Sequence, residues 1–398
     1  MAKYHRQYKN IGSIFMVSEE YLKQLMILVD LSDTKYEKFK NKIQEVKKEE
    51  TIIIYGAGGG GQWLLELLSR YAIRVIAFFD SDPEKWNNSV KGLPVCNPEK
   101  NPIKNSNNAL IIIALRNSKA QIEVLNYLGY LGYTNVILYS QIWNNFIYDP
   151  DVDIKKMFDT NKLIKVAKLW KDQKSSDVFI DAIRFHTIYN HEMNNELQNG
   201  IQYFPEDVPM KRKFDCFIDC GAYTGDTIME LYNKFGKVKK IIAFEPDSDN
   251  FLKLSQYLKT NSKKVCDQLL LYPCGVWSET TQMRFSDRCN ASSAITSDGE
   301  SMKQFVALDE VIFNIKPEFI KMDVEGAEVE ALQGAKEMIC LNKPDLAICL
   351  YHRIDHLWDI ALLINNWNLG YDFYIRRHDY AMEIVMYATV MDERYRRN

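Results

Sequence analysis

Short apolar runs alternate with helical patterns over two long stretches of the chain. Residues 51–86 contain, in order, a buried strand, a glycine turn, an amphipathic helix, a second strand and an acidic turn. The runs ALIIIALRN and NVILYS continue this alternation to about Tyr139. Because each strand is apolar along its whole length, the pattern predicts a parallel sheet that is covered on both faces.

The order of strand, glycine turn, helix and strand begins again at residue 214. The segment FDCFIDCGAYTGDT predicts a strand followed by a glycine turn, and IIAFEPD, LLLYPCGVW, FIKMDVEGAE and DLAICLYHR predict further strands. Near the end of the chain, YDFYIRRHDYAMEIVMYATV has two β-rich runs joined by a short polar turn. These runs predict an antiparallel hairpin that closes the edge of the sheet.

The fold class that follows is α/β, with two Rossmann-like parallel-sheet domains joined by a helical connector. We place an N-terminal helical segment at residues 1–50 and the first Rossmann-like domain at 51–145. The connector takes 146–205, where helical spacing dominates, and the second domain takes 206–398. We expect the second sheet to end in the antiparallel hairpin.

Composition narrows the functional classes. Hydrophobic residues make up 46% of the 398 residues, and 50 basic against 53 acidic residues give a net charge of -3. This is ordinary globular composition without the basic excess of a general nucleic-acid binder. The sequence lacks a long apolar run and a secretion-signal pattern, and the eight cysteines form no Cys-x-x-Cys pair. We therefore expect a cytoplasmic protein with reduced thiols and no membrane insertion.

The first glycine turn, GAGGGG, matches the dinucleotide fingerprint. Gly56, Gly58 and Gly61 are its three glycines, and Asp80 follows at close to the spacing of a ribose-binding acid, about 20 residues. Glycines let the backbone approach a phosphate, which the amides of the next helix then bind. The turn is either a nucleotide site or a purely structural one.

The second glycine turn differs, because an acid, Asp219, precedes its first glycine, Gly221. Such a turn suits a ligand with a cationic amino-acid end, whose ammonium Asp219 attracts. Glu245 ends the next strand, where a carboxylate accepts hydrogen bonds from both hydroxyls of a ribose. The other turn residues that we assign to the cofactor are Tyr223, Gly225, Asp226 and Thr227.

Three further assignments concern the surroundings of that pocket. Asp247 is either a cofactor ligand or the cap of the following helix. Trp277 either packs beside the adenine or belongs to the core. The polar segment 286–300 predicts a loop over the pocket, although an ordinary surface connection has the same composition.

These motifs resemble those of the FkbM family of S-adenosylmethionine-dependent methyltransferases. The resemblance covers roughly residues 214–390 and rests on FIDCGAYTGDT, AFEPD, CGVWSE, VALDE and, most specifically, FIKMDVEGAEVEALQGA. It implies a seven-stranded sheet, S-adenosylmethionine as the methyl donor and O-methylation in glycoside, polysaccharide or secondary-metabolite assembly. Residues 51–140 resemble the small Rossmann-like domains that accompany sugar O-acyltransferases, which implies a role in nucleotide-sugar binding.

Candidate catalytic residues follow the strands of the second domain. Asp323 and Glu325 come after FIKM, and His352 comes after LAICLY, so all three belong at the carboxyl edge of the sheet. His352 is the candidate general base because its ordinary pKa is nearest to neutral, with Asp323 orienting its ring. Alternatively, Asp323 and Glu325 hold a divalent ion. Arg376 and Arg377 either meet a phosphate of the acceptor or are exposed strand residues.

Three functions compete at this point. The first is an S-adenosylmethionine-dependent O-methyltransferase whose small-molecule or glycan acceptor is a sugar, a nucleotide sugar or a glycoconjugate. The second is a catalytically silent nucleotide-sugar sensor that uses the first Rossmann-like domain. The third, an NAD-dependent oxidoreductase, has the least support because no hydride-transfer domain accompanies the first glycine turn.

Overall fold

A computed structural model describes residues 18–49, 51–100, 109–115, 118–138, 154–188, 201–286, 294–295, 301–312, 314–378 and 383–390. The chain divides into two compact units, which we treat separately. The first comprises residues 24–158 and 181–195. The second comprises residues 1–23, 159–180 and 196–398, so the expected connector is shared between the two. Helix α1 (Glu19–Lys47) contributes residues to both units.

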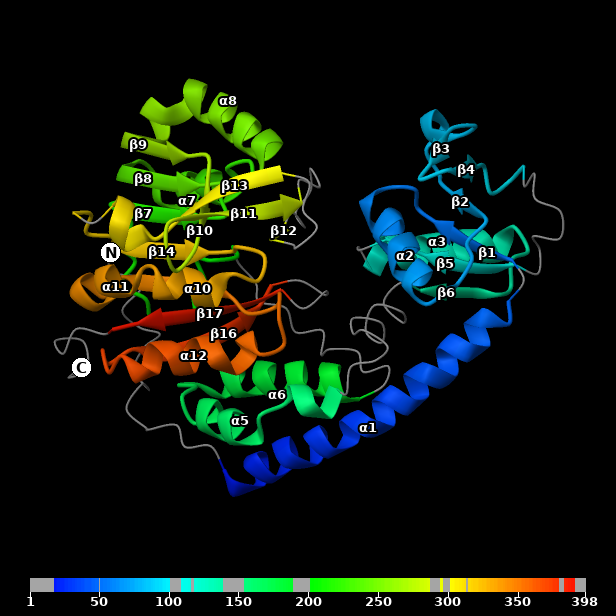
Figure 1. Ribbon diagram of the computed structural model, residues 1–398, viewed down its shortest axis with the longest axis horizontal. Helices are drawn as coiled ribbons and strands as arrows, with labels where there is room; N and C mark the ends of the chain where they lie inside the picture. The colour runs from blue at the N-terminus through cyan, green and yellow to red at the C-terminus, as the bar shows by residue number, and fades with distance from the viewer. Residues whose placement is uncertain are drawn as a thin grey trace. The chain divides into compact units, whose positions relative to one another are not determined.

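The first unit is built on a six-stranded sheet of order β3-β4-β2-β1-β5-β6 (Figure 1). All pairs are parallel except β3 with β4. The strands are β1 (Ile52–Tyr55), β2 (Ala77–Phe79), β3 (Ser89–Val90), β4 (Leu93–Cys96), β5 (Leu110–Ile113) and β6 (Val136–Leu138). The helical segments are α2 (Gly59–Arg70), η1 (Pro83–Lys85), α3 (Ser118–Tyr130) and η3 (Ile154–Met157). Alternate residues of β1 enter different cores, Ile52 and Ile54 on one face and Ile53 and Tyr55 on the other. This two-sided burial explains the continuous apolar run.

The second unit contains a seven-stranded sheet of order β16-β17-β15-β14-β7-β8-β9 (Figure 1). Its strands are β7 (Cys216–Cys220), β8 (Val238–Phe244), β9 (Cys266–Tyr272), β14 (Phe319–Met322), β15 (Asp345–Cys349), β16 (Asp372–Arg377) and β17 (Ile384–Thr389). The last two pair antiparallel, and β17 is also antiparallel to β15. The fold class, including the closing hairpin, is therefore confirmed. One part of the core is a group of contacting aromatic rings, Phe204, Phe214, Phe217 and Phe319, and the exposed Phe235 packs against two of them.

Helices cover this sheet: α7 (Asp226–Phe235), α8 (Ser248–Val265), α9 (Leu308–Val311), α10 (Glu328–Gln333), α11 (Lys336–Asn342) and α12 (His356–Asn366). From the expected connector, helix α5 (Thr160–Ala167) also belongs to this unit, and helix α6 (Gln173–Thr187) belongs to it up to Ile180. Helix α5 contacts α12, and Trp170, 1% exposed, forms a bridge to Phe373 of β16 (Figure 1). Residues 159–180 thus pack as part of the unit that holds the seven-stranded sheet.

A small four-stranded sheet of order β10-β13-β11-β12 was not expected from the sequence. Its strands are β10 (Gly275–Val276), β11 (Thr281–Ser286), β12 (Ala294–Ile295) and β13 (Ser301–Val306). These strands are short and mix polar with apolar residues, so they lack a clear strand pattern. The expected loop over the pocket, residues 286–300, lies outside the described residues except for Ser286, Ala294 and Ile295, which belong to strands.

Candidate active site

The sheet register brings the expected site residues to one edge. Cys220, the last residue of β7, pairs with Phe244 of β8 on one side and with Met322 of β14 on the other. Gly221, Glu245 and Asp323 each follow these paired residues directly, so they lie next to one another at the carboxyl ends of the strands. Strand order reverses between β7 and β14, and ligands of open α/β sheets bind at such a switch point.

A glycine is required at position 221 because two backbone segments, at Gly221 and at Asp323, approach each other closely. Its φ is +81°, and a Cβ built there would lie 1.8 Å from the carbonyl oxygen of Asp323. Gly225, with φ +93°, caps α7, where its own Cβ would press on Leu254. Tyr223 is 37% exposed between them. In the first turn of α7, Thr227 is buried and Asp226 is exposed. Tyr223 and Asp226 are therefore the exposed residues of this turn.

Glu245 is 6% exposed and accepts two backbone hydrogen bonds. Its Oε2 lies 2.8 Å from the amide nitrogen of Tyr223, and its Oε1 lies 2.9 Å from that of Asp247. Burial raises the pKa of Glu245 to about 7, although these two amides act in the opposite direction. The carboxylate is thus fixed against the glycine turn by the same segment that the sequence assigns to the cofactor.

Asp219 is fully buried, and its ammonium partner belongs to the protein. Lys321 of β14 stands opposite Asp219 in the sheet register, and their Nζ and Oδ1 atoms are 3.1 Å apart. Lys321 also donates to the carbonyl oxygen of Gly221, at 2.6 Å. Burial acts to lower the pKa of Lys321, but Asp219 and Asp323 outweigh it and the pKa is raised. In this structure Asp219 therefore supports the turn through Lys321, where the sequence interpretation had it attract the ligand's ammonium.

The two remaining cofactor candidates, Asp247 and Trp277, have different surroundings. The carboxylate of Asp247 accepts from the amides of Asp249 and Asn250, at 3.0 and 2.9 Å, so the helix-cap alternative describes its contacts. Trp277 is partly buried, and its ring meets that of Phe305 edge-on at 6.5 Å. Trp277 thus packs against the small sheet while remaining partly exposed.

The three candidate catalytic residues do come together. Nε2 of His352 lies 3.4 Å from Oδ1 of Asp323 and 3.6 Å from Oε2 of Glu325. His352 follows β15, which pairs with β14, so the register again explains the meeting. The side chains are 9%, 22% and 32% exposed for His352, Asp323 and Glu325, which places the two carboxylates nearer to solvent.

Sequence reasoning missed the carboxylate that orients His352. Nδ1 of His352 is 2.7 Å from Oε1 of Glu328, a fully buried residue of α10 that also lies 3.1 Å from Nδ1 of His356. Glu328 thus has the orienting position that we predicted for Asp323. Burial would lower the pKa of His352, but Glu328, Asp323 and Glu325 raise it to about 9. Without a ligand in the site, His352 therefore favours its protonated form at neutral pH.

Two tyrosines, also missed, hold Asp323 in place. The hydroxyl of Tyr203 donates to Oδ2 of Asp323 at 2.8 Å, and that of Tyr351 donates to Oδ1 at 3.0 Å. Burial acts to raise the pKa of Asp323, but Lys321, His352 and Tyr203 lower it. Asp323 is thus an ionised and oriented carboxylate.

The arginines of the hairpin do not form a phosphate site. Arg376 is 1% exposed and pairs with Asp172 at 2.6 Å and with Asp207 at 2.8 Å. Arg377 is 3% exposed. Both alternatives considered for Arg376, a phosphate ligand or an exposed strand residue, are therefore wrong, because its charge is used to attach the segments at residues 172 and 207 to the sheet.

In the first unit, the glycine turn has the geometry of its fingerprint. Gly56 has φ +105°, and a Cβ on Gly61 would lie 1.8 Å from the carbonyl oxygen of Gly56. Gly58 caps α2, and a Cβ there would meet no atom within 4 Å. The Asp80 carboxylate accepts from the amides of Ala57 and Asp82 and pairs with Lys85 at 3.1 Å. In this structure Asp80 thus braces the turn itself.

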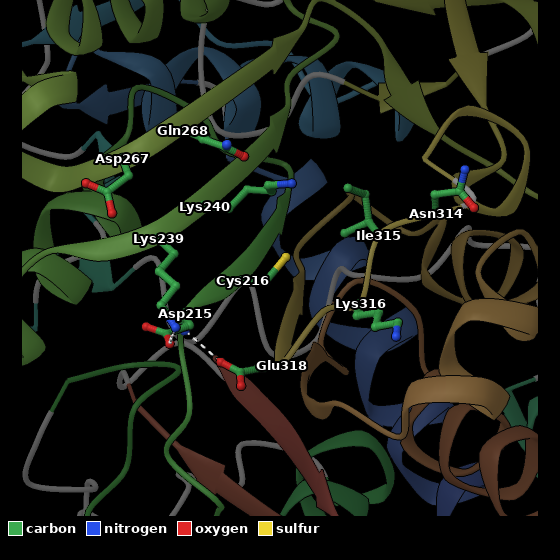
Figure 2. A pocket seen from close by; sticks show the side chains of 10 residues that line it. All are labelled: Asp215, Cys216, Lys239, Lys240, Asp267, Gln268, Asn314, Ile315, Lys316 and Glu318. Atoms are coloured by element: carbon green, nitrogen blue, oxygen red, sulfur yellow. Dashed lines mark hydrogen bonds and ion pairs between the residues drawn. The ribbon is translucent and has the colours of Figure 1, made fainter.

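A separate pocket of about 550 Å³ opens at the opposite edge of the seven-stranded sheet (Figure 2). Glu318, Asp215 and Lys239, near the amino ends of the strands, are among the residues that line it, and Lys239 pairs with Asp215 at 2.6 Å. None of the expected site residues lines this pocket. It lies at the edge that α/β sheets do not use for ligands.

The comparisons with known proteins identify both units. The family model of the methyltransferase FkbM domain matches residues 219–380, and that of the PglD N-terminal domain matches residues 51–128. No curated protein matches the chain. In the described residues, no helix has the length and apolar character to span a membrane.

One solved structure is similar in fold over most of the chain, and two others match a smaller part of it. Methyltransferase FkbM from Methylobacillus flagellatus KT has 20% identity and a TM-score of 0.68, and the match covers 92% of this chain and 100% of that one. Fibrillarin from Aeropyrum pernix, in complex with S-adenosyl-L-methionine, has 9% identity, a TM-score of 0.28 and coverage of 45% and 67%. A putative rRNA methylase from Clostridium thermocellum has 11% identity, a TM-score of 0.29 and coverage of 45% and 89%. Both family resemblances are thus confirmed at the level of the matched segments: residues 219–380 match the methyltransferase FkbM domain, and residues 51–128 match the PglD N-terminal domain.

Proposed function

We propose that the chain transfers the methyl group of S-adenosylmethionine to a hydroxyl of a sugar, a nucleotide sugar or a glycoconjugate. The observation that carries the proposal is the junction of β7, β8 and β14, where the glycine turn, Glu245 and the cluster of Asp323, Glu325 and His352 share one edge. A donor site and a set of proton-handling groups are then adjacent. Methyl transfer needs such adjacency because donor and acceptor must be aligned in line.

The described residues fit the donor. The positive φ values of Gly221 and Gly225 shape the turn that follows β7, and the amino-acid end of the donor would lie against this turn in our proposal. Glu245, fixed by two amides, offers its carboxylate to the ribose hydroxyls. Asp219 contributes through Lys321, which holds the carbonyl of Gly221.

In the reaction, the bond between sulfur and methyl carbon breaks, and its electron pair stays on sulfur. A lone pair of the acceptor oxygen forms the new bond to carbon. As that bond forms, the oxygen becomes positively charged and its proton strongly acidic, so an ionised carboxylate is able to accept it. Asp323, ionised and held by Tyr203 and Tyr351, has this role in our proposal, while Glu325 and His352 orient the hydroxyl.

Transfer of a labelled methyl group tests the proposal. The purified chain is incubated with methyl-labelled S-adenosylmethionine and a panel of sugars, nucleotide sugars and oligosaccharides. We expect base-stable label in at least one acceptor class, with the label lost in Asp323→Asn. Donor binding without transfer to any sugar class would contradict the acceptor assignment, and absence of donor binding would contradict the activity itself.

For the first unit we propose nucleotide-sugar binding at the glycine turn. The match to a PglD N-terminal domain and the open backbone at Gly58 support it. Gly58→Asp adds a negative charge at the start of α2 without a clash, so it should repel a pyrophosphate. Titration with nucleotide sugars should show binding that Gly58→Asp abolishes, while binding of S-adenosylhomocysteine is unchanged. Binding that is equal in both proteins would contradict this placement.

A further inference from the structure

The cluster at the end of β14 has the atoms of a metal site. Asp323, Glu325 and His352 each offer one ligand atom, and these three atoms lie within 4.8 Å of one another. They come from two neighbouring strand ends. The set combines two carboxylate oxygens with one imidazole nitrogen, which is a mixed donor set rather than a group of acids alone.

The separations match those of ligands around one ion. Nε2 of His352 is 3.4 Å from the Asp323 oxygen and 3.6 Å from the Glu325 oxygen. Atoms bound to a small divalent ion at about 2.1 Å in tetrahedral or octahedral geometry are about 3.0 to 3.4 Å apart. A modest contraction of the two carboxylates toward His352 would therefore suffice to coordinate an ion.

The second, independent observation is the state of Nε2 of His352. The side chain is more than nine-tenths buried, and this nitrogen is itself buried without a hydrogen-bond partner among the described residues. It points between the two carboxylates, at distances too long for good hydrogen bonds to both. A divalent cation between the three groups would displace any proton from Nε2 and give this buried atom a partner.

The second ring nitrogen of His352 has a carboxylate partner, as is usual for histidines that ligate a metal. Nδ1 is held at 2.7 Å by Oε1 of Glu328, which also accepts from the amide of Val324 at 3.0 Å. Histidines that ligate a metal usually donate their other nitrogen to such a carboxylate, which fixes the ring. Tyr203 and Tyr351 fix Asp323 in the same way.

We propose that Asp323, Glu325 and His352 bind a divalent cation of the manganese or zinc class. One imidazole and two carboxylates favour these ions over calcium, which prefers an all-oxygen shell. Three protein ligands leave coordination positions open. This step rests on the proposed function: the acceptor hydroxyl would take one of these positions, where the ion would lower its pKa, and its proton would pass to Asp323 as the methyl group is transferred.

Binding of the metal alone tests the site without any acceptor. The full chain is stripped with a chelator and titrated with Mn²⁺, and bound ion is followed by electron paramagnetic resonance, with Zn²⁺ as competitor. We expect one saturable site per chain. Glu325→Gln and His352→Gln should each weaken it at least 10-fold, and Glu328→Gln, which removes only the support, by about 10-fold to 100-fold. Asp267→Asn, at the opposite edge of the sheet, should leave affinity unchanged.

Titration of the same samples with S-adenosylhomocysteine separates the two proposals. Donor binding without saturable Mn²⁺ or Zn²⁺ binding in the folded wild type overturns the metal site and leaves the methyltransferase intact. Metal binding that Glu325→Gln and His352→Gln do not weaken also overturns it. Metal binding without donor binding supports the metal site and contradicts the proposed function.

Discussion

The ammonium of Lys321 lies 3.1 Å from the carboxylate of Asp219, and both side chains are almost completely buried. The two residues face each other across β14 and β7, and Lys321 also donates to the carbonyl oxygen of Gly221. A buried ion pair therefore underlies the glycine turn. Its two charges need each other, because either one alone would remain desolvated and uncompensated.

Lys321→Met tests this dependence. We expect the variant to lose about 3 to 5 kcal/mol of unfolding free energy, because Asp219 is left buried without its cation. Adding Asp219→Asn should restore part of the loss. Urea denaturation measures the change, with hydrogen exchange at the β7 amides assigning it to the second unit. A single variant as stable as the wild type would contradict the pairing.

Gly221→Ala should lower the unfolding free energy of the second unit by more than the strain of a positive φ accounts for. The new Cβ would lie 1.8 Å from the carbonyl of Asp323, whereas Gly236, with φ +80°, has no atom within 4 Å of the corresponding position. We expect Gly236→Ala to cost about 1 to 2 kcal/mol through backbone strain, and Gly221→Ala to cost clearly more and to abolish donor binding. Equal losses of unfolding free energy in the two variants would refute the close approach.

Donor affinity should depend on pH through Glu245. Its folded pKa, raised to about 7 from 4.5, means that this group stabilises the fold less as pH rises from about 4.5 through 7. Ribose hydroxyls donate best to the ionised form, so affinity for S-adenosylhomocysteine should rise by up to about 10-fold from pH 6 to pH 8. Calorimetry over this range should give a flat profile for Glu245→Gln. A wild-type profile that is flat as well would be inconsistent with this role.

Arg376 should be essential for packing of the second unit. It is 1% exposed and bonds to Asp172, Asp207 and the hydroxyl of Ser175. Arg376→Lys keeps a charge but loses the forked contact, and we expect a loss of about 2 to 4 kcal/mol in urea denaturation.

The matched control is Arg353→Lys, whose side chain is 58% exposed beside Asp355. An exposed pair contributes about 0 to 1 kcal/mol, so this variant should be close to the wild type. Equal losses of unfolding free energy in the two variants would contradict a stabilising role for the buried bonds of Arg376.

Much of the fold and part of the site follow from local sequence. The apolar runs, the helical spacing and the turn residues between them predicted both sheets and the hairpin. The end of each strand predicted where Glu245, Asp323 and His352 would lie. The pairing of Lys321 could also have been predicted from the sequence. A lysine inside the apolar run FIKM needs a buried partner, and Asp219 occupies the corresponding place in FIDC.

The rest depends on contacts that no local pattern encodes. Tyr203 reaches Asp323 from far along the chain, and Arg376 takes partners from residues 172 and 207. Glu328 orients His352 from a helix whose acidic pattern is equally that of a solvated face. The raised pKa of His352 follows from this arrangement, whereas the choice of His352 as base rested on the ordinary histidine pKa.

Calorimetric titration with S-adenosylhomocysteine tests the central claim most directly. Wild-type protein, Glu245→Ala and the control Asp267→Ala are compared, since Asp267 lies at the opposite edge of the sheet (Figure 2). We expect saturable binding with one site per chain in the wild type and the control, and its loss in Glu245→Ala while the fold is retained. Absence of binding in the folded wild type, or equal binding in all three proteins, would contradict a methyl-donor site at the ends of β7 and β8.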